Sequence, residues 1–144
     1  MVTDTAPTPD GLVTTFYRAF AGRPDLLADA VTPDWEDIPL APGQGPGPDG
    51  VVPIILGLRE ALADLEIVVH QVVDGRDATG NGTVATRCEI RGRHVGELVG
   101  VPASGRTVSI ALHEFHDVVG GRIRRTHHLE DWAGFRAQAG GGAG

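Results

Sequence analysis

The chain has 144 residues, of which 41% are hydrophobic and 22% charged, and its formal net charge is −7. This length and composition predict a single globular domain over residues 1–144, with flexible ends at 1–9 and 139–144, rather than a disordered or fibrous chain. The acidic balance argues against a nucleic-acid partner. No apolar run approaches the roughly 18 residues of a membrane span, and the N-terminus has no secretory signal, so we expect a cytoplasmic protein.

Helical patterns dominate the first half of the chain. Apolar residues at helical spacing predict a helix over 12–20 and a shorter one over 26–31, each bounded by Gly or Pro. The stretch 39–50, PLAPGQGPGPDG, is too rich in Pro and Gly for regular structure and predicts a loop. A third helix is predicted over 51–65, where a proline is tolerated in the first turn.

In the second half of the chain, apolar and polar residues alternate, as is typical of β-strands. Four strands are predicted over 66–73, 83–94, 106–118 and 122–130, joined by turns rich in Gly, and a short helix follows over 132–138. Helices followed by an antiparallel meander indicate the α+β class. The pattern fits a strongly curved, cone-shaped antiparallel sheet wrapped around the N-terminal helices, with a pocket at its open end.

Strand parity places ionisable groups on the concave face. In the third strand, the more apolar set also contains Glu114 and His116. The last strand is ambiguous, because apolar weight favours the set containing Ile123 and Leu129 over the set containing Thr126 and His128.

A histidine and a carboxylate in an apolar pocket can acquire shifted pKa values and transfer protons. His128 could pair in this way with Glu114 or with Asp131, or it could simply bond to backbone or water. Asp131 could instead cap the last helix. No metal is expected, because a histidine site would need His116 and His128 to meet across strands. Cys88, the only cysteine, is predicted to be a core residue.

Two segments, GRHVGELVGVPASGR (92–106) and HEFHDVVGGRIRRTHHLEDW (113–132), resemble the SnoaL-like polyketide cyclases, which are related to nuclear transport factor 2 and the ketosteroid isomerases. The resemblance covers residues 12–138. It implies an α+β barrel of the nuclear transport factor 2 type, an apolar cavity and a homo-oligomer, dimer or tetramer. It also implies intramolecular aldol ring closure of aromatic polyketides in antibiotic biosynthesis, without metal or cofactor.

The resemblance also implies site residues, and on its grounds we place the His128 set on the concave face. His128 stands where the family carries its acid/base aspartate, Glu114 and Leu112 stand at polar positions of the preceding strand, and Asp37 stands where the family has an asparagine. We therefore predict His128 as the acid/base, with Glu114 orienting it and Asp37 and Asp131 as further candidates. The predicted substrate-binding residues are Phe16, Tyr17, Phe20, Trp35, Leu56, Ile110, Leu112 and His116.

The exchange of aspartate for histidine leaves the reaction open. Cofactor-independent hydroxylation, epoxide opening or a pericyclic cyclisation in the same pocket are alternatives. A non-catalytic binding or partner module is an alternative of another class. A loop 39–50 that caps a deep pocket would favour an enzyme, and an interior filled by side chains would favour the binding module.

Overall fold

A computed structural model of the chain describes residues 11–140. The ends predicted to be flexible lie outside the described residues, except for Ala139 and Gly140, which close the last helix through backbone hydrogen bonds. Within the described range, no helix has the length and apolar character needed to span a membrane.

The helices lie where the periodicity predicts them, with one shift. Helix α1 (Gly11–Phe20) and helix α2 (Leu27–Ala30) form the predicted pair, and helix α4 (Trp132–Gln138) closes the described chain. Helix α3 (Gly47–Ala61) begins and ends about one turn earlier than predicted. The proline in the first turn is Pro48, where proline is favoured, and Pro53 lies inside the helix and not in its first turn, where the sequence analysis places it. The predicted loop shortens to 39–46.

The sheet contains a strand that the sequence analysis missed. Strand β1 (Val31–Ile38) runs parallel to the last strand, so the sheet is mixed and open rather than wholly antiparallel. Its residues Val31, Trp35 and Asp37 are buried. Pro33 and the acidic residues hid this strand in the sequence, and they are tolerated because β1 lies at the sheet edge.

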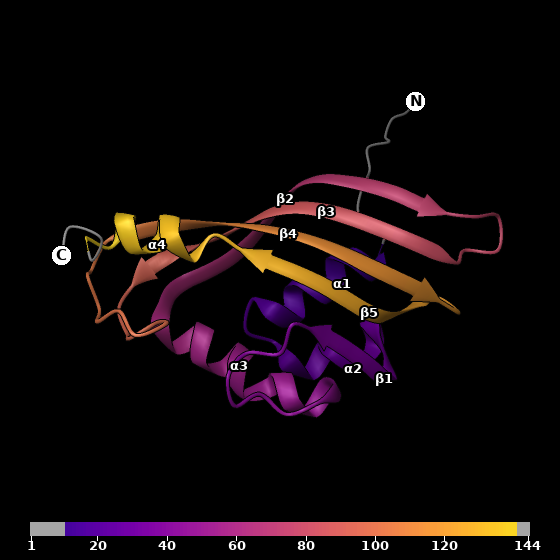
Figure 1. Cartoon of the computed structure of the whole chain (residues 1–144), viewed down its shortest axis with the longest axis horizontal. Helices are drawn as coiled ribbons and strands as arrows, with labels where there is room; N and C mark the ends of the chain where they lie inside the picture. The colour runs from indigo at the N-terminus through magenta and orange to yellow at the C-terminus, as the bar shows by residue number, and fades with distance from the viewer. Residues whose placement is uncertain (1–10, 141–144) are drawn as a thin grey trace.

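The remaining strands form the predicted meander. They are β2 (Leu62–Arg76), β3 (Gly82–His94), β4 (Thr107–Val119) and β5 (Arg122–Glu130), and the sheet order is β1-β5-β4-β3-β2. Helices α1, α2 and α3 lie on one face of the curved sheet, and α4 lies at one end (Figure 1). The α+β class and the wrapping of the sheet around the N-terminal helices are confirmed.

Strand β5 changes face partway along. The pairing shifts between Asp117 and Val118, so that Val118 lies opposite Ile123 and Asp117 lies opposite Arg125. One residue is therefore extra on β5, as in a β-bulge. Ile123 from one predicted set and Thr126 from the other are both fully buried, so each parity assignment holds for only part of the strand.

Candidate active site

A group of polar side chains is buried inside the apolar core. Asp37, Thr86, Glu114, His116 and Thr126 are each less than 9% exposed. They come from β1, β3, β4 and β5 of the one sheet, on the face that α1, α2 and α3 cover (Figure 1). Buried polar groups are stable only with hydrogen-bond partners. His116 and Thr126 bond to each other, and the other hydrogen-bond partners of the group are Tyr17, Trp35 and Gln44.

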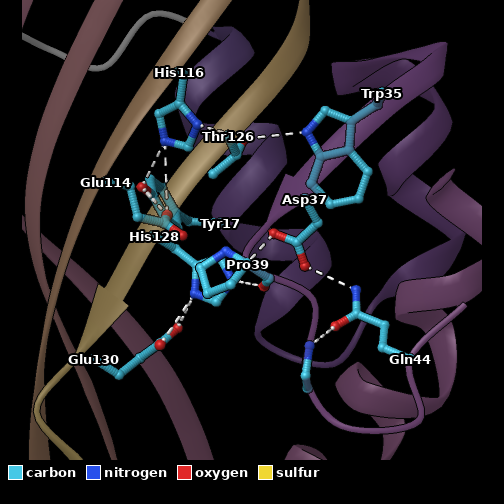
Figure 2. Close-up of polar contacts among 11 residues, drawn as sticks. Tyr17, Trp35, Asp37, Pro39, Gln44, Glu114, His116, Thr126, His128 and Glu130 are labelled. Carbon is cyan, nitrogen blue, oxygen red and sulfur yellow. Dashed lines mark hydrogen bonds and ion pairs between the residues drawn. The ribbon is translucent and has the colours of Figure 1, made fainter. Parts of the chain in front are cut away.

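The hydroxyl of Tyr17, on α1, lies at the centre of this group. It donates a hydrogen bond to Oε1 of Glu114 at 2.6 Å, and it lies 2.6 Å from Oγ1 of Thr86 and 2.9 Å from Nε2 of His116 (Figure 2). The structure thus places Tyr17, predicted as a substrate-binding residue, in contact with the predicted carboxylate.

His116 extends the network toward β1. Its Nδ1 lies 2.9 Å from Oγ1 of Thr126, which also accepts a hydrogen bond from Nε1 of Trp35 at 3.1 Å. The ring of Phe16 packs on His116 with a centroid separation of 4.7 Å. The predicted lining residues Phe16, Trp35 and His116 are therefore tightly packed together.

Burial shifts the ionisation of this inner network. It raises the pKa of Glu114 to about 8, although the Tyr17 hydrogen bond and the nearby His128 act in the opposite direction. It lowers the pKa of His116 to about 3 and raises the pKa of Tyr17 well above its ordinary value. At neutral pH, His116 and Tyr17 are neutral and Glu114 is mostly protonated.

A second polar group surrounds His128, directly opposite Glu114 on the neighbouring strand. Its Nδ1 lies 2.9 Å from Oε2 of Glu130, and its Nε2 lies 2.7 Å from the carbonyl oxygen of Pro39 and 3.5 Å from Oδ1 of Asp37 (Figure 2). The partner that orients His128 is therefore Glu130, rather than the predicted Glu114 or Asp131.

These acceptors favour the charged form of His128. Burial lowers its pKa, but Glu130, Asp37 and the Pro39 carbonyl outweigh burial and raise it to about 9. The ring is an imidazolium at neutral pH, and both nitrogens donate. A protonated ring cannot accept a proton, so His128 can supply one or stabilise a developing negative charge.

Asp37 links this group to the loop 39–46. Burial raises the pKa of Asp37, although Gln44 and His128 act against it. Nε2 of Gln44 donates to Oδ2 of Asp37 at 2.9 Å, and Oε1 of Gln44 accepts from the backbone of Ala41. Gln44 thereby connects the loop to Asp37 by hydrogen bonds.

The open space lies outside the packed interior. A pocket of about 310 Å³ is lined by Asp37, Pro39, Leu40, Pro46 and Gly47. A second, of about 280 Å³, lies between α1 and β2 and reaches Tyr17. Side chains fill the interior, and the loop 39–46 lines an open pocket at the surface rather than capping a deep one, which favours the binding module over an enzyme.

The other predicted residues lie at varying distances from these groups. Phe20 packs on Phe16 at 4.7 Å, Ile110 and Leu112 are buried on β4, and Leu56 is half-buried on α3. Asp131 is exposed and accepts a hydrogen bond from the Gly134 backbone at 2.8 Å, so it caps α4. The capping alternative is confirmed for Asp131.

Several residues of the site were missed. Glu130 could have been found, because it follows His128 by two positions and strand parity puts both on one face. Thr126 and Thr86 could not be predicted as site residues, because threonine is common in strands and its position alone does not indicate a hydrogen-bonding role. Gln44 lies in a loop whose path the sequence does not determine. Among residues 11–140, no group of three or more His, Cys, Asp or Glu side chains could hold a metal ion.

Comparisons with known proteins agree on the family and the fold. The family model described as SnoaL-like polyketide cyclase matches residues 11–139. A comparison with curated protein sequences found no match. Among solved structures, the chain is similar to TsrD from Streptomyces laurentii, with a TM-score of 0.79, 25% identity, and coverage of 90% of this chain and 92% of that chain.

Two further structures broaden the comparison. IdmH, a proposed polyketide cyclase from Streptomyces antibioticus, has a TM-score of 0.75 and 26% identity and covers 92% of this chain and 99% of its own. AclR, a proposed hydroxylase from Streptomyces galilaeus, has a TM-score of 0.72 and 21% identity, with coverage of 90% and 83%. The likeness to AclR concerns the fold alone.

Proposed function

Because the chain belongs to the SnoaL-like polyketide cyclases, we propose that it is an enzyme that closes a ring in an aromatic polyketide by acid/base catalysis. The observation that supports this most is the pairing of Glu114 with His128 across β4 and β5. Their surroundings shift both pKa values into the range from 8 to 9, so one carboxylate and one imidazolium can coexist there.

In the proposed reaction, ionised Glu114 removes a proton from the carbon next to a substrate carbonyl. The resulting enolate carbon attacks a second carbonyl carbon and forms the new carbon–carbon bond. His128 donates a proton to the oxygen of the attacked carbonyl, and the proton on Glu114 then returns to His128. Atoms and electrons balance without an oxidant, a metal or another co-reactant, and the product has the mass of the substrate.

The roles differ from those that the resemblance implied. His128 is the acid rather than the base, because Glu130 and Asp37 keep it protonated. Glu114 is the base, because Oε1 is held by Tyr17 and no described side chain hydrogen-bonds to Oε2. Asp37 holds His128 in place and lies beside the pocket that would receive the substrate.

The test is a mass-spectrometric assay with tricyclic anthraquinone polyketide esters. A product of unchanged mass that disappears in His128→Ala, with kcat lower by about 10²–10⁴, supports the proposal. A gain of one oxygen would point to hydroxylation, and a gain of water to epoxide opening. Ester binding without any product would favour the binding module. The variant Asp25→Ala, at an exposed ion pair, is the control and should keep full activity.

We also propose that the chain forms a homo-oligomer through the outer face of the sheet. Val73, Ala85, Phe115 and His127 lie side by side across β2 to β5, and Leu129 lies next to them. Phe115 is 57% exposed and Leu129 74%, which is unusual for large apolar side chains grouped on one face. The cytoplasmic location remains a prediction.

A further inference from the structure

An unbroken chain of hydrogen bonds runs through the core from Trp35 to Glu114 (Figure 2). Its contacts are Trp35 Nε1 to Thr126 Oγ1 at 3.1 Å, Thr126 Oγ1 to His116 Nδ1 at 2.9 Å, His116 Nε2 to the Tyr17 hydroxyl at 2.9 Å, and that hydroxyl to Glu114 Oε1 at 2.6 Å. We call these five side chains the relay. They come from β1, β5, β4 and α1, so only the folded molecule assembles them.

The two ends of the relay determine the direction of every proton in it. Tyr17 donates to Glu114, so its oxygen must accept from Nε2 of His116, and the ring proton lies on Nε2. Nδ1 is then an acceptor, and the Thr126 hydroxyl donates to it. The indole of Trp35 can only donate, and it does so to Thr126. Each bond agrees with the next.

Thr86 completes the environment of Tyr17. Its Oγ1 lies 2.6 Å from the Tyr17 oxygen. Because the Tyr17 proton is already directed at Glu114, the Thr86 hydroxyl must donate to Tyr17. A phenolic oxygen has two acceptor sites, and His116 and Thr86 donate to them. The Cys88 thiol also contacts Tyr17, but it is a weak acceptor, so the Glu114 carboxylate is the acceptor that directs the Tyr17 proton.

We infer that Tyr17 is the positioning residue of this site, locked by His116 and Thr86 so that its proton points only at Oε1 of Glu114. The inference rests on the proposed role of Glu114 as the base. Its consequence is that a proton taken from the substrate lands on Oε2, the oxygen that no described side chain binds. The relay thus decides which oxygen of Glu114 reacts.

The ionisable groups around Glu114 fit this role. Burial keeps His116 neutral, with a pKa of about 3, and keeps the Cys88 thiol protonated, with a pKa of about 11. The groups of the facing strands that can carry charge near pH 8 are Asp37 on β1 and His128 and Glu130 on β5. Glu114 is therefore the only member of the relay that titrates near pH 8.

The relay can be tested without any substrate, because its far end carries a reporter. The chain has two tryptophans, so two indole N–H resonances are expected in a ¹H–¹⁵N NMR spectrum. We expect the Trp35 resonance to move with pH with the same midpoint, about 8, as the side-chain carboxyl ¹³C resonance of Glu114. Trp132, on α4, lies outside the relay and is the internal control.

Two variants separate the relay from a purely structural network. Thr126→Val removes one hydroxyl at nearly constant volume, and it should abolish the shift of Trp35 while Glu114 still titrates. The matched control is Thr107→Val at an exposed position of β4, which should leave both titrations unchanged. Tyr17→Phe removes a donor to a carboxylate and should raise the Glu114 midpoint by about one to two pH units.

Two results would overturn the inference. One is a Trp35 indole resonance in Thr126→Val that still shifts with the midpoint of Glu114. That result would show that the charge of Glu114 acts on Trp35 through space and not through the hydrogen bonds of the relay. The other is a Glu114 midpoint unchanged in Tyr17→Phe. These NMR measurements need no turnover, so they are independent of the activity assay. If the titrations behave as expected but the chain has no cyclase activity, the proposed function is rejected and the hydrogen-bonded relay is still supported.

Discussion

At the scale of single residues, the main result is the exchange of roles between His128 and Glu114. Both nitrogens of His128 have acceptors, Glu130 on one side and Pro39 with Asp37 on the other. Glu114 is buried and accepts a hydrogen bond from Tyr17 alone among the described side chains. The histidine is therefore held charged and the carboxyl is held neutral, the reverse of their usual states at pH 7.

This exchange predicts a bell-shaped pH dependence of kcat/KM. The base Glu114 is ionised above about pH 8 and the acid His128 is protonated below about pH 9, so activity should be maximal between them. The variant Glu130→Gln removes the strongest hydrogen bond to the imidazolium and should move the alkaline limb toward neutral pH. A profile that rises near pH 6 and stays flat above it would instead make neutral His128 the base.

At the scale of elements, α4 provides a test that separates structure from catalysis at Asp131. Its carboxylate caps the helix by accepting from the Gly134 backbone. Asp131→Ala should therefore lower the free energy of unfolding by about 1 kcal/mol and leave kcat and KM unchanged. Asp131→Asn, which keeps a capping oxygen, should restore stability. A tenfold loss of activity in both variants would return Asp131 to the catalytic candidates.

Helix α3 and the loop 39–46 make a second test, because the loop carries Pro39 and Gln44 to the site. A Cβ atom at Gly50 would lie 1.8 Å from the carbonyl oxygen of Gly45, so the backbone must move to accept it. We expect Gly50→Ala to displace the loop, to lower the free energy of unfolding by about 1–3 kcal/mol, and to reduce activity, as measured by chemical denaturation and the ester assay.

The control lies in the same helix. A Cβ atom at Gly57 meets nothing within 4 Å. Gly57→Ala should therefore raise the free energy of unfolding by about 0.5–1 kcal/mol through helix propensity, with no change in activity. Equal activity of the two variants would mean that the position of the loop does not matter to the reaction.

At the scale of the whole molecule, the buried charges should make stability depend on pH. The pKa of Glu114 rises from 4.5 to about 8 on folding, so the folded chain holds a proton that the unfolded chain loses, and stability falls as pH rises through this range. The pKa of His128 rises from 6.5 to about 9, so its stabilising contribution is complete below 6.5 and is lost toward pH 9. The two effects have the same sign.

Thermal unfolding should therefore show Tm falling between about pH 6.5 and pH 9. Below pH 6.5 the buried His116, whose pKa is lowered to about 3, acts in the opposite direction, because the unfolded chain binds a proton there that the folded chain does not. In Glu114→Gln the slope below pH 8 should flatten, and above pH 8 the variant should be more stable than the parent chain. Glu97→Gln, at an exposed position, should keep the parent slope. A Tm that is constant from about pH 6.5 to pH 9 would show that the folded chain does not raise the pKa values of Glu114 and His128.

The outer face of the sheet makes a prediction about assembly. Leu129→Lys places a charge on the exposed apolar face and should convert an oligomer to monomers, as measured by size-exclusion chromatography with light scattering. Val95→Lys changes a residue that is 40% exposed outside this face, and it should leave the assembly intact. A monomeric parent chain at micromolar concentration would reject the proposal.

More of the fold than of the candidate site could be predicted from the sequence. Alternation in β3 and β4 placed Val84, Cys88, Ile110 and Glu114 on the buried face correctly. It failed on β1, because Pro33 and the acidic residues hide the alternation, and on β5, because a bulge changes the parity between Ile123 and Thr126. An extra residue in a strand leaves no mark in the pattern until its partner strand is known.

By itself, the sequence determined the α+β class, the meander from β2 to β5 and the inward orientation of Glu114 and His116, and it offered the capping of α4 as one of two roles for Asp131. These depend on periodicity and on residues close in the chain, which local backbone geometry controls. Only the tertiary structure decided the parallel pairing of β1 with β5, the loop over His128 and the contact of Tyr17 with Glu114, 97 residues away. Protonation belongs to this second group, because a pKa depends on burial and on partners that folding brings together.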